Sequence, residues 1–556
     1  MSPETTTDGY KVDHRRQYVD GTELIVSNYT PRGTRRDGVE KIVFFGLQYL
    51  VKKYLIQEWN ENFFNVDEET VVRRFYRRIK GYLGEDAAKA IGVEHIRDLH
   101  KLGYLPIKIL ALPEGTECNL RVPSLVIYNT KPEFFWITNY LETLLSVTLW
   151  GPCTSATTAF QYRKLFEQYA KETVGNTDFV QWQGHDFSFR GMFGLEAACM
   201  SGGAHLAVGF TGTDTIPAID WLEDYYNADS DKELVAASVP ATEHSVACST
   251  ILNFVEKVRV ENAGRPNQFV IEDELMDLAD IEYVRHLITD LYPKGIVSIV
   301  SDSFDYWNTI INTARILKNE IMGRDGKVVF RPDTGDPVKV VCGYNKIHSP
   351  EFFTGEEREI EIARNLGRDA VVYNQNVCEI GSVFEKAGCK LSGAEIKGSI
   401  ECLWDIFGGT ITEKGYKLLD SHVGLIYGDS ITLQRAKDIC SQLKNKGFAS
   451  INLVYGIGSY TYQYVTRDTD GNAVKSTYSV VDGKPIPIYK KPKTGDGLKN
   501  SAFGLTAVYK DGNNFVLKDG VTWEEMHNCE LKPVFENGQL LKNWTLQEIR
   551  ENLSKP

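Results

Sequence analysis

Apolar runs alternate with helical runs between Val180 and Val465, and polar residues follow each apolar run. The six runs are Ala204–Phe210, Leu234–Val239, Gly295–Val300, Lys327–Phe330, Val423–Tyr427 and Phe448–Val454. This order is typical of a (β/α) barrel, whose active site gathers at the carboxyl ends of its strands, although an open doubly wound sheet produces the same alternation. The number of repeats and the absence of a G-x-G-x-x-G turn favour an irregular α/β barrel over residues 180–465.

Three segments outside this alternation have distinct patterns. Residues 342–419 are Gly-rich and polar, and predict an insertion on the barrel. Leu141–Trp150 and Thr154–Val174 predict two helices separated by Gly151 and Pro152. The run VVRRFYRRIKGY, Val71–Tyr82, predicts a helix with a basic face, which we interpret as solvated.

Composition limits the class of protein. A chain of 556 residues with 42% hydrophobic residues can form a large core in two or more domains. Its formal net charge of -13 argues against a general binder of nucleic acid or of anionic membranes. The acidic balance does not exclude a small polyanionic substrate held in a local basic pocket.

The cysteines and the N-terminus indicate a compartment. None of the 10 cysteines forms a C-x-x-C pair, so their spacing indicates neither a zinc site nor a disulfide framework. Reduced thiols are typical of cytosolic proteins. The N-terminus lacks the apolar stretch of a signal peptide, and no apolar run reaches membrane-spanning length. We therefore expect a cytoplasmic protein with no membrane and no nucleic acid among its partners.

The stretch SVPATEHS, Ser238–Ser245, joins an apolar run to a helical run at Val246–Val260. It places Glu243 and His244 at the start of the predicted helix. Alternating α/β proteins place chemistry where a strand ends in polar groups at a helix N-terminus. Taken alone, His244 is most simply interpreted as a polar residue that begins a helix. The residues at the other strand ends favour a functional role for it instead.

The residues that follow the strands are mostly acids, together with arginine and histidine. They are Asp214, Glu243, His244, Asp302, Arg331, Asp333 and Asp429, joined by His185, Phe187 and Arg190 of HDFSFR. Arginine binds phosphate or carboxylate through two parallel hydrogen bonds, and several carboxylates can hold Mg²⁺, bind sugar hydroxyls or stabilise a developing cation. A phenylalanine offers a flat surface to a planar ring. A lone aspartate after a strand is often only a helix cap, but the joint occurrence predicts a site.

Two enzyme classes fit these residues. A metal-dependent hydrolase would take its ligands from His185, His205, His244 and Asp302. A transferase acting on a phosphorylated sugar would use arginine for the phosphate, and aspartate for the metal and the ribose. Two arginines and two Gly-containing strand ends favour phosphate, and the paired histidines at short spacing that a hydrolase would use are missing.

The chain resembles the nicotinamide phosphoribosyltransferase family over most of its length. The motifs, in the family's order, are TDGYKVDHRRQY, FFGLQYLVKKYL, HDFSFRG, HLAVGFTGTDT, SVPATEHS, VSIVSDSFDYWN, RPDTGDP, GDSITLQ and TRD. The resemblance implies a reaction that joins nicotinamide to 5-phosphoribosyl 1-pyrophosphate, giving nicotinamide mononucleotide and pyrophosphate. It also implies an irregular barrel over residues 180–465, beside a β-rich α+β domain built from residues 1–179 and 466–556. The family works as a homodimer with shared active sites.

The resemblance assigns four residues to nicotinamide. Phe187 and Tyr10, the latter from the partner subunit, would sandwich the ring. Asp214 would accept a hydrogen bond from the carboxamide NH₂, with Arg331 beside the amide. The pyridine nitrogen is already nucleophilic, so it needs orienting more than activating, and stacking supplies the orientation.

The resemblance assigns a larger set of residues to the phosphoribosyl side. They are Arg190, Asp302, Asp333, Asp429, Gly458, Arg32, Arg467 and Lys475, with Asp8 and His185 in support. His244 would be phosphorylated from ATP, which couples ATP hydrolysis to product formation, and Glu243 flanks it. Carboxylates would stabilise the ribosyl centre as it becomes cationic, while Mg²⁺, held mainly through the substrate pyrophosphate, neutralises the leaving group.

The chain departs from the family at two positions of the phosphate loop, and two alternative functions stay open. Ser459 and Tyr460 stand where the family's phosphate loop has further glycines, whose backbone N–H groups approach phosphate closely. One alternative is a nicotinate phosphoribosyltransferase, and another is a catalytically silent binding homologue. A silent homologue has no reason to keep together His244, Asp302, Arg331 and Asp429.

Overall fold

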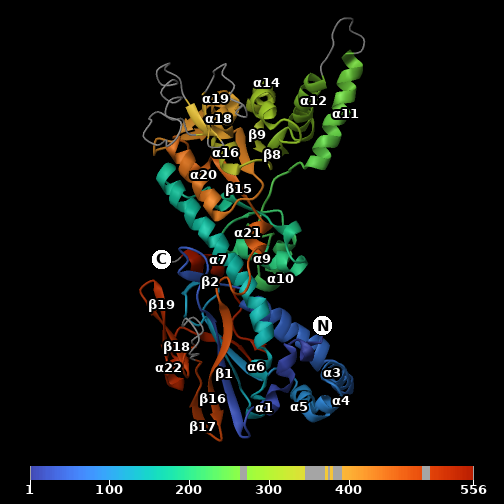
Figure 1. Ribbon diagram of the computed structural model, residues 1–556, viewed down its shortest axis with the longest axis vertical. Coiled ribbons are helices and arrows are strands. Elements are labelled where there is room, and N and C mark those ends of the chain that lie inside the picture. Colours follow the sequence, from blue (N-terminus) through green and yellow to red (C-terminus); the bar gives the residue numbers. More distant parts are fainter. Residues whose placement is uncertain are drawn as a thin grey trace.

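The computed structural model describes residues 2–262, 272–344, 370–373, 376–379, 391–490 and 501–554. A parallel sheet with its helices forms one end of the molecule and an antiparallel sheet forms the other, with helix α7 (Glu142–Thr173) running between them (Figure 1). Within the described ranges, no helix is long and apolar enough to cross a membrane.

The parallel sheet has the strand order β7-β6-β15-β14-β9-β8. Its strands are β6 (Gly184–Phe187), β7 (Gly212–Thr213), β8 (Lys294–Val300), β9 (Asp325–Arg331), β14 (Val423–Tyr427) and β15 (Leu453–Gly458). Segment 237–241 joins the two edges, because Ala237 pairs with Gly212 of β7 and Ala241 pairs with Ser298 of β8. The sheet therefore curls into the predicted irregular barrel.

Helices cover the outside of the barrel (Figure 1). They include α8 (Val180–Gln183), α9 (Leu195–Ala207), α10 (Pro217–Tyr226), α11 (His244–Asn262), α12 (Glu272–His286), α13 (Tyr306–Asn308), α14 (Ala314–Ile316), α15 (Lys318–Met322), α16 (Pro337–Cys342), α20 (Leu433–Asn445) and α21 (Ser459–Gln463).

Three of the six predicted strands are confirmed, as β8, β9 and β14. The prediction at Ala204–Phe210 was wrong, since most of this run belongs to helix α9. A short apolar run does not distinguish a strand from a buried helix. Here Gly202 and Gly203 let α9 approach α10, since a Cβ at these positions would come within 2.8 Å of Ala218 and 2.6 Å of Trp221.

Two further strand predictions were shifted or wrong. Leu234–Val239 forms no strand and contributes only the bridge of Ala237. In the last run, Ser450–Asn452 is a 3₁₀ turn, and β15 begins at Leu453 and continues beyond the predicted end at Val454 through Gly456 to Gly458. Glycine weakens a strand but does not end one where neighbouring strands supply hydrogen bonds.

The antiparallel sheet draws on both ends of the chain. Its order is β17-β16-β1-β5-β3-β20-β21. The strands are β1 (Thr22–Pro31), β3 (Ile107–Ala111), β5 (Leu125–Asn129), β16 (Asn472–Val481), β17 (Lys484–Pro487), β20 (Lys532–Glu536) and β21 (Gln539–Leu540). Smaller pairs are β2 (Lys41–Phe44) with β4 (Thr116–Asn119), and β18 (Thr506–Asp511) with β19 (Asn514–Asp519). The predicted second α+β unit from both chain ends is therefore present, and its residue boundaries stay predictions.

Helices accompany this sheet. They include α1 (His14–Gln17), α2 (Leu47–Tyr49), α3 (Glu68–Leu83), α4 (Glu85–Ile91), α5 (Glu94–Leu102), α6 (Ile137–Tyr140), α22 (Trp523–His527) and α23 (Leu546–Ser554).

Helix α7 corrects the prediction of two helices split at Gly151 and Pro152. It continues through both residues. A proline inside a helix removes one hydrogen bond, and packing can offset that loss. The Pro152 ring lies against Gly46, which has a φ of 105° and no side chain to obstruct the ring.

The predicted insertion falls partly outside the described residues, which omit 345–369, 374–375 and 380–390. Residues 391–419 form α18 (Gly393–Lys397), α19 (Ser399–Phe407) and the pair β12 (Gly409–Ile411) with β13 (Lys417–Leu419). Helix α19 buries four apolar side chains, Ile400, Leu403, Ile406 and Phe407. This part of the segment is thus packed as barrel cover, and its status as an insertion stays a prediction.

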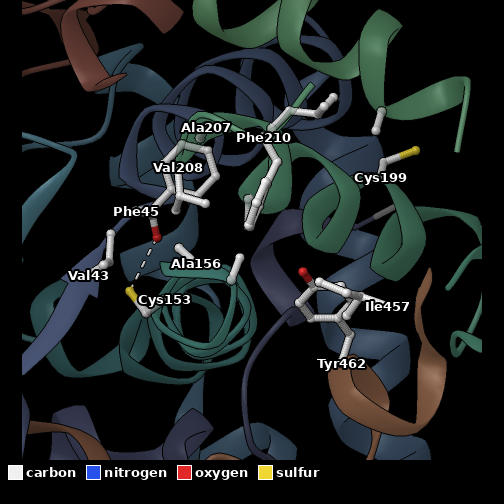
Figure 2. Packing of buried hydrophobic residues seen from close by; sticks show 14 of the residues in the cluster. Val43, Phe45, Cys153, Ala156, Cys199, Ala207, Val208, Phe210, Ile457 and Tyr462 are labelled. Atoms are coloured by element: carbon white, nitrogen blue, oxygen red, sulfur yellow. Dashed lines mark hydrogen bonds between the residues drawn. The ribbon is translucent and has the colours of Figure 1, made fainter. Parts of the chain in front are cut away.

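The hydrophobic core is continuous across α7 (Figure 2). On one side, Cys153 of α7 donates its thiol hydrogen to the Phe45 carbonyl at 3.2 Å, beside Val43 of β2. On the other side, Ala156 faces Phe210 and Tyr462 of the barrel region (Figure 2). Since one core serves both sheets, α7 sets the position of the barrel relative to the antiparallel sheet.

Candidate active site

Parallel pairing brings the carboxyl ends of the strands together. Phe187 at the end of β6 pairs with Gly458 at the end of β15, and Val300 of β8 pairs with Arg331 of β9. A cavity of about 500 Å³ enters the barrel here. Its lining at this end includes His185, Phe187, Asp214 and Arg331. The strand ends thus supply the aromatic, acidic and basic groups that the sequence predicts for a small-molecule site.

His185 and Asp214 form a pair at the mouth of this cavity. His185 Nε2 lies 2.8 Å from Asp214 Oδ1, and the Ser238 hydroxyl donates to the same oxygen at 3.3 Å. Burial acts to raise the pKa of Asp214, but the hydrogen bond and charge of His185, with help from Ser238 and Arg331, hold the pKa below its usual value. Asp214 therefore stays an ionised group that only accepts hydrogen bonds.

The Phe187 ring lies over glycines of the neighbouring strands. A Cβ at Gly456 would come within 2.5 Å of this ring, and one at Gly428 within 3.7 Å. The His185 ring flanks it, with centroids 4.7 Å apart. Because the glycines have no side chains, the phenyl ring has a fixed place beside the acceptor Asp214, as a stacking surface requires.

Asp186 holds the ends of β6 and β7 in place, a role that the sequence analysis missed. It is fully buried and accepts hydrogen bonds from Ser188 N at 2.9 Å and from the hydroxyls of Thr213 and Thr215 at 3.1 and 2.7 Å. A polar residue between His185 and Phe187 in a strand must point into the protein, and this alternation could have identified it.

His205 lies in the core and not at the cavity. Its Nδ1 is 2.7 Å from the Tyr462 hydroxyl, its Nε2 is 3.3 Å from the Gly184 carbonyl oxygen, and burial lowers its pKa to about 4. Both ring nitrogens are engaged, so His205 is not available as a metal ligand. Among the described residues, no three His, Cys, Asp or Glu side chains are grouped so that they could hold a metal ion. His205 therefore does not belong to the ligand set that the metal-dependent hydrolase would use.

His244, Asp302 and Asp333 meet at the next strand ends. His244 Nε2 lies 3.6 Å from Asp302 Oδ1 and 3.6 Å from Asp333 Oδ2, and its Nδ1 lies 3.3 Å from the Ser303 hydroxyl. The ring thus presents one nitrogen to two carboxylates. The sequence analysis expected these residues to lie together, and they do.

Asp302 is the most constrained acid of the site, with its side chain 2% exposed. Its Oδ2 accepts hydrogen bonds from Asp333 N, Thr334 N and the Thr334 hydroxyl at 2.8 to 2.9 Å, while its Oδ1 is buried without a hydrogen-bond partner. Burial raises the pKa of Asp333, Arg331 opposes that shift, and the charge of Asp302 adds to it. A buried oxygen without a partner marks a place where a ligand or cation would be favourable.

Other predicted residues of the barrel lie at its surface. Glu243 is exposed, and its carboxylate accepts the Ser245 hydroxyl rather than His244. Arg331 donates to the Thr242 carbonyl. Arg190 and Asp429 are exposed near the strand ends.

The predicted phosphate loop has Ser459 and Tyr460 at positions where the family pattern has glycines. Helix α21 begins at Ser459, directly after Gly458, and the Ser459 side chain packs against Gly191. Tyr460 points outward, 61% exposed, and stacks on Tyr464 with centroids 5.3 Å apart. The two residues that replace glycines therefore face other groups, and the half-buried Gly458 has no other group of the described residues within 4 Å of the position that a Cβ would take.

The remaining predicted residues form a second group near the N-terminus. Asp8 accepts the Thr143 hydroxyl at 2.7 Å, Tyr10 is 65% exposed, and Lys475 lies 3.4 Å from Glu142. Arg32 donates to the Gly471 carbonyl at 3.2 Å and Arg467 lies 3.4 Å from Asp468.

We call these five residues the N-terminal group, and His185, Phe187, Asp214, His244, Asp302, Arg331 and Asp333 the barrel group. Within the described part of the chain, no hydrogen bond or ion pair joins the two groups. Tyr10 has His14 as its aromatic neighbour, at 5.4 Å, and not Phe187. One chain thus holds two separate parts of the predicted site.

Known proteins match both the fold and the sequence of this chain. The crystal structure of nicotinate-nucleotide pyrophosphorylase from Pyrococcus furiosus shares the fold, with a TM-score of 0.50 and 14% identity over 99% of this chain and 94% of that chain. Residues 182–539 match the nicotinate phosphoribosyltransferase family model, and residues 4–109 match the N-terminal domain of nicotinamide phosphoribosyltransferase.

Two relatives that match nearly the whole chain are named nicotinamide phosphoribosyltransferase. Nicotinamide phosphoribosyltransferase of Acinetobacter baylyi is 45% identical over all of this chain and 97% of its own length. The enzyme of the same name from Xanthomonas campestris pv. campestris is 28% identical over 98% of this chain and 96% of its own length. The chain belongs to the nicotinate phosphoribosyltransferase family and is a phosphoribosyltransferase. The predicted resemblance and the predicted enzyme class are confirmed.

Proposed function

We propose that the chain transfers the phosphoribosyl group of 5-phosphoribosyl 1-pyrophosphate to nicotinamide, giving nicotinamide mononucleotide and pyrophosphate in NAD salvage. The observation that supports this best is the ionised Asp214 beside the Phe187 ring, held by His185 at 2.8 Å. This acceptor suits the NH₂ of a carboxamide and repels a carboxylate. The Acinetobacter baylyi relative, named for this activity, supports the same acceptor.

In the proposed reaction, the pyridine nitrogen attacks the anomeric carbon of ribose while the bond from that carbon to the pyrophosphate oxygen breaks. Phe187 and Asp214 orient the ring. Asp302 and Asp333, across the barrel mouth, stabilise the positive charge that develops on the ribosyl centre. Arg331 binds beside the amide, and Arg190, Asp429 and the backbone at Gly458 bind the phosphoribosyl group.

Mg²⁺ belongs to this proposal as a partner of the substrate. In this proposal the metal is carried mainly on the pyrophosphate of the substrate. The unpartnered Oδ1 of Asp302 is the oxygen best suited to contact it. When bound, the metal neutralises the leaving pyrophosphate.

ATP enters as the coupling substrate through His244. The side chain is 44% exposed, and its ring is oriented by the Ser303 hydroxyl on one nitrogen and two carboxylates beside the other. Such a histidine can accept a phosphoryl group on an accessible nitrogen. Glu243 flanks it at the start of α11.

The proposed assembly is a homodimer with shared active sites. In the barrel group, Phe187 has the His185 ring as its aromatic neighbour, and the exposed Tyr10 of a second copy would supply the second ring of a sandwich around nicotinamide. Exposed apolar residues beside the strand ends would be covered by the same contact. They include Phe193 at 87%, Tyr464 at 79% and Tyr460 at 61%. We also propose a cytoplasmic location, which the eight free cysteines of the described residues support.

In the test, purified protein is given labelled phosphoribosyl pyrophosphate together with either nicotinamide or nicotinate. We expect rapid release of labelled pyrophosphate with nicotinamide and a far lower kcat/KM with nicotinate. A preference for nicotinate would identify the alternative enzyme, and no turnover with either, in folded protein supplied with Mg²⁺ and ATP, would identify a silent homologue.

A further inference from the structure

Helix α3 presents four arginines on one face. Arg73, Arg74, Arg77 and Arg78 form two adjacent rows at spacing i, i+4. The opposite face buries Val71, Val72, Phe75 and Ile79. Like charges four residues apart destabilise a helix by a few tenths of a kcal/mol per pair. The packing of α3 therefore accounts for its apolar face and not for the arginine face.

Nearby basic residues show what an ordinary solvated face looks like in this protein. Lys80 pairs with Glu85 at 2.5 Å, Arg16 with Asp13 at 3.2 Å, and Arg97 with Glu68 and Glu69. By contrast, Arg73, Arg77 and Arg78 form no hydrogen bond or ion pair within the described residues. In a chain with a net charge of -13, three neighbouring arginines without an ion pair among the described residues are a local exception, and Glu69 acts on Arg73 only through its charge.

The fourth arginine, Arg74, is paired with an acid, unlike the other three within the described ranges. Arg74 donates to both carboxylate oxygens of Glu4, at 2.5 and 2.9 Å, and to the Asn62 carbonyl at 2.7 Å. Glu4 is fully buried, and its backbone carbonyl accepts the Tyr140 hydroxyl at 2.5 Å. The N-terminal segment is thereby clamped against α3, and Figure 1 shows the chain start beside this helix.

A concavity of about 770 Å³ opens over the arginines. Its lining consists of Ser2, Thr70, Arg73, Arg74, Arg77, Arg78, Gly81 and Tyr82. This volume suits a small ligand. The lining offers guanidinium groups and hydroxyls and no carboxylate.

We propose that this arginine pocket binds a linear di- or triphosphate group. Guanidinium forks bind phosphate oxygens through paired charge-assisted hydrogen bonds, and adjacent phosphates match adjacent arginines. An extended polyanion such as nucleic acid or a membrane surface would also have to lie along the acidic remainder of the protein, which opposes it. A short polyphosphate chain fits within the pocket and avoids that repulsion.

The pocket adjoins the segment that holds part of the proposed active site. Tyr82, in its lining, packs against Gly9, which stands between Asp8 and Tyr10. A phosphate held between Ser2 and the arginines would therefore tighten the segment that presents Tyr10. The site is separate from the transfer reaction, so it can be tested without turnover.

The experiment measures binding of inorganic triphosphate to the full chain by calorimetry, and maps the bound region by hydrogen exchange. We expect slower exchange in residues 68–83 and 2–13. The variant R73Q/R77Q/R78Q should bind at this site at least about tenfold more weakly, because it loses three charged donors while keeping good helix formers. The variant R73K/R77K/R78K keeps the charge without the fork and should lie between.

A matched control removes three other exposed, unpaired basic residues, as K101Q/K318Q/K437Q. It has the same net charge as the glutamine variant and should retain binding at α3. Pyrophosphate and ATP are tested in parallel, and equal protection by ATP and triphosphate would locate recognition in the phosphates.

Three results would overturn the proposal. They are unchanged protection of residues 68–83 in a folded R73Q/R77Q/R78Q variant, equal loss of binding in the control variant, and protection of α3 by duplex DNA or phosphatidylserine vesicles but not by triphosphate. The two-substrate assay above is independent of all three, so failure here leaves the proposed reaction standing.

Discussion

The barrel group and the N-terminal group differ in how their side chains are held. In the barrel group, Asp302 is buried and accepts three hydrogen bonds, and the buried Asp186 of β6 also accepts three. In the N-terminal group, Tyr10 is 65% exposed and Lys475 only approaches Glu142, at 3.4 Å. The chain alone preorganises the barrel group, whereas the N-terminal group needs further contacts to fix its geometry.

The difference follows from the secondary structure. Strand ends in a parallel sheet are neighbours by register, so backbone pairing alone sets their spacing. In the N-terminal group, Lys475 lies on strand β16, but the other four residues lie on turns or in a short 3₁₀ helix, where no strand register sets their distances. The comparison predicts that substitutions in the barrel group act within one chain and that substitutions in the N-terminal group act on the partner's site.

The largest expected effect comes from Asp302→Asn. The substitution keeps the shape but removes one of the two carboxylate charges beside His244 that would stabilise the developing cation, so kcat/KM should fall by about 10²–10³-fold. The control is Asp336→Asn, one loop away, whose carboxylate caps α16 through Val338 N and Lys339 N. Steady-state kinetics should show the control within about threefold of the parent. Equal losses in the two variants would remove the distinction between catalytic and capping acids.

The second prediction mixes a Tyr10→Ala protein with an Asp302→Ala protein and allows subunits to exchange. Each variant alone should be nearly inactive. If the sites are shared, half the dimers are mixed and each has one intact site of two, so activity should return to about a quarter of the parent. Persistent inactivity in dimers shown to be mixed by mass spectrometry would reject a site built from two chains.

The third prediction concerns Asp214. Two carboxylates about 4 Å apart repel by roughly 4 kcal/mol at an effective dielectric near 20, before relaxation softens it. Asp214→Ser should therefore narrow the preference for nicotinamide over nicotinate by at least about tenfold, measured as the ratio of kcat/KM values. If Asp214 only supports the local fold, both activities fall together and the ratio stays constant.

The fourth prediction concerns His244. His244→Ala should keep the fold and lose the stimulation by ATP, because no other histidine faces both Asp302 and Asp333 among the described residues. The control is His286→Ala, which removes a half-buried histidine paired with Asp290. Initial rates with and without ATP, together with a test for acid-labile phosphate on the protein, measure the effect. Undiminished stimulation in the variant would reject the phosphorylated histidine.

Sequence reasoning succeeded where the strand pattern was strong. It predicted the barrel, and it identified His185, Asp302, Arg331 and Asp333 as residues that meet at strand ends. It failed at Ala204–Phe210, because a seven-residue apolar run has no period long enough to separate a helix from a strand. It failed at Pro152, because the Pro152 ring fits beside Gly46. Local helix propensity gives no information about a contact between residues so far apart in the sequence.

The supporting residues of the site were harder to predict than its chemistry. Asp186 and His205 act through buried contacts with residues such as Thr215 and Tyr462, and those partners are separated in the sequence by up to 257 positions. Glu243 was expected beside His244, yet its nearest donor is Ser245, as a residue at a helix start would have. Its proposed role stays a prediction.

The smallest expected effect on activity comes from Glu114, which lies where the part of the molecule with the antiparallel sheet meets helix α10 of the barrel. It is fully buried and accepts hydrogen bonds from Gly46 N at 2.7 Å, from Gln48 N at 2.5 Å and from the Tyr226 hydroxyl of α10 at 3.0 Å. Burial raises its pKa to about 7, against a usual value of 4.5, and its hydrogen bonds only partly oppose the shift. The folded state therefore binds this proton more tightly than the unfolded state.

A raised carboxyl pKa contributes stability that is complete below about pH 4.5 and is lost as pH rises towards 7, by up to about 3 kcal/mol. Relative to Glu114→Gln, the parent protein should thus lose unfolding free energy between pH 5 and pH 7.5, while kcat/KM at pH 7 changes by less than about twofold. Chemical denaturation of both proteins across this range measures the difference in slope. Parallel pH profiles would show that Glu114 is ionised throughout, held by its three donors, and that the contact between the two regions is insensitive to pH in this range.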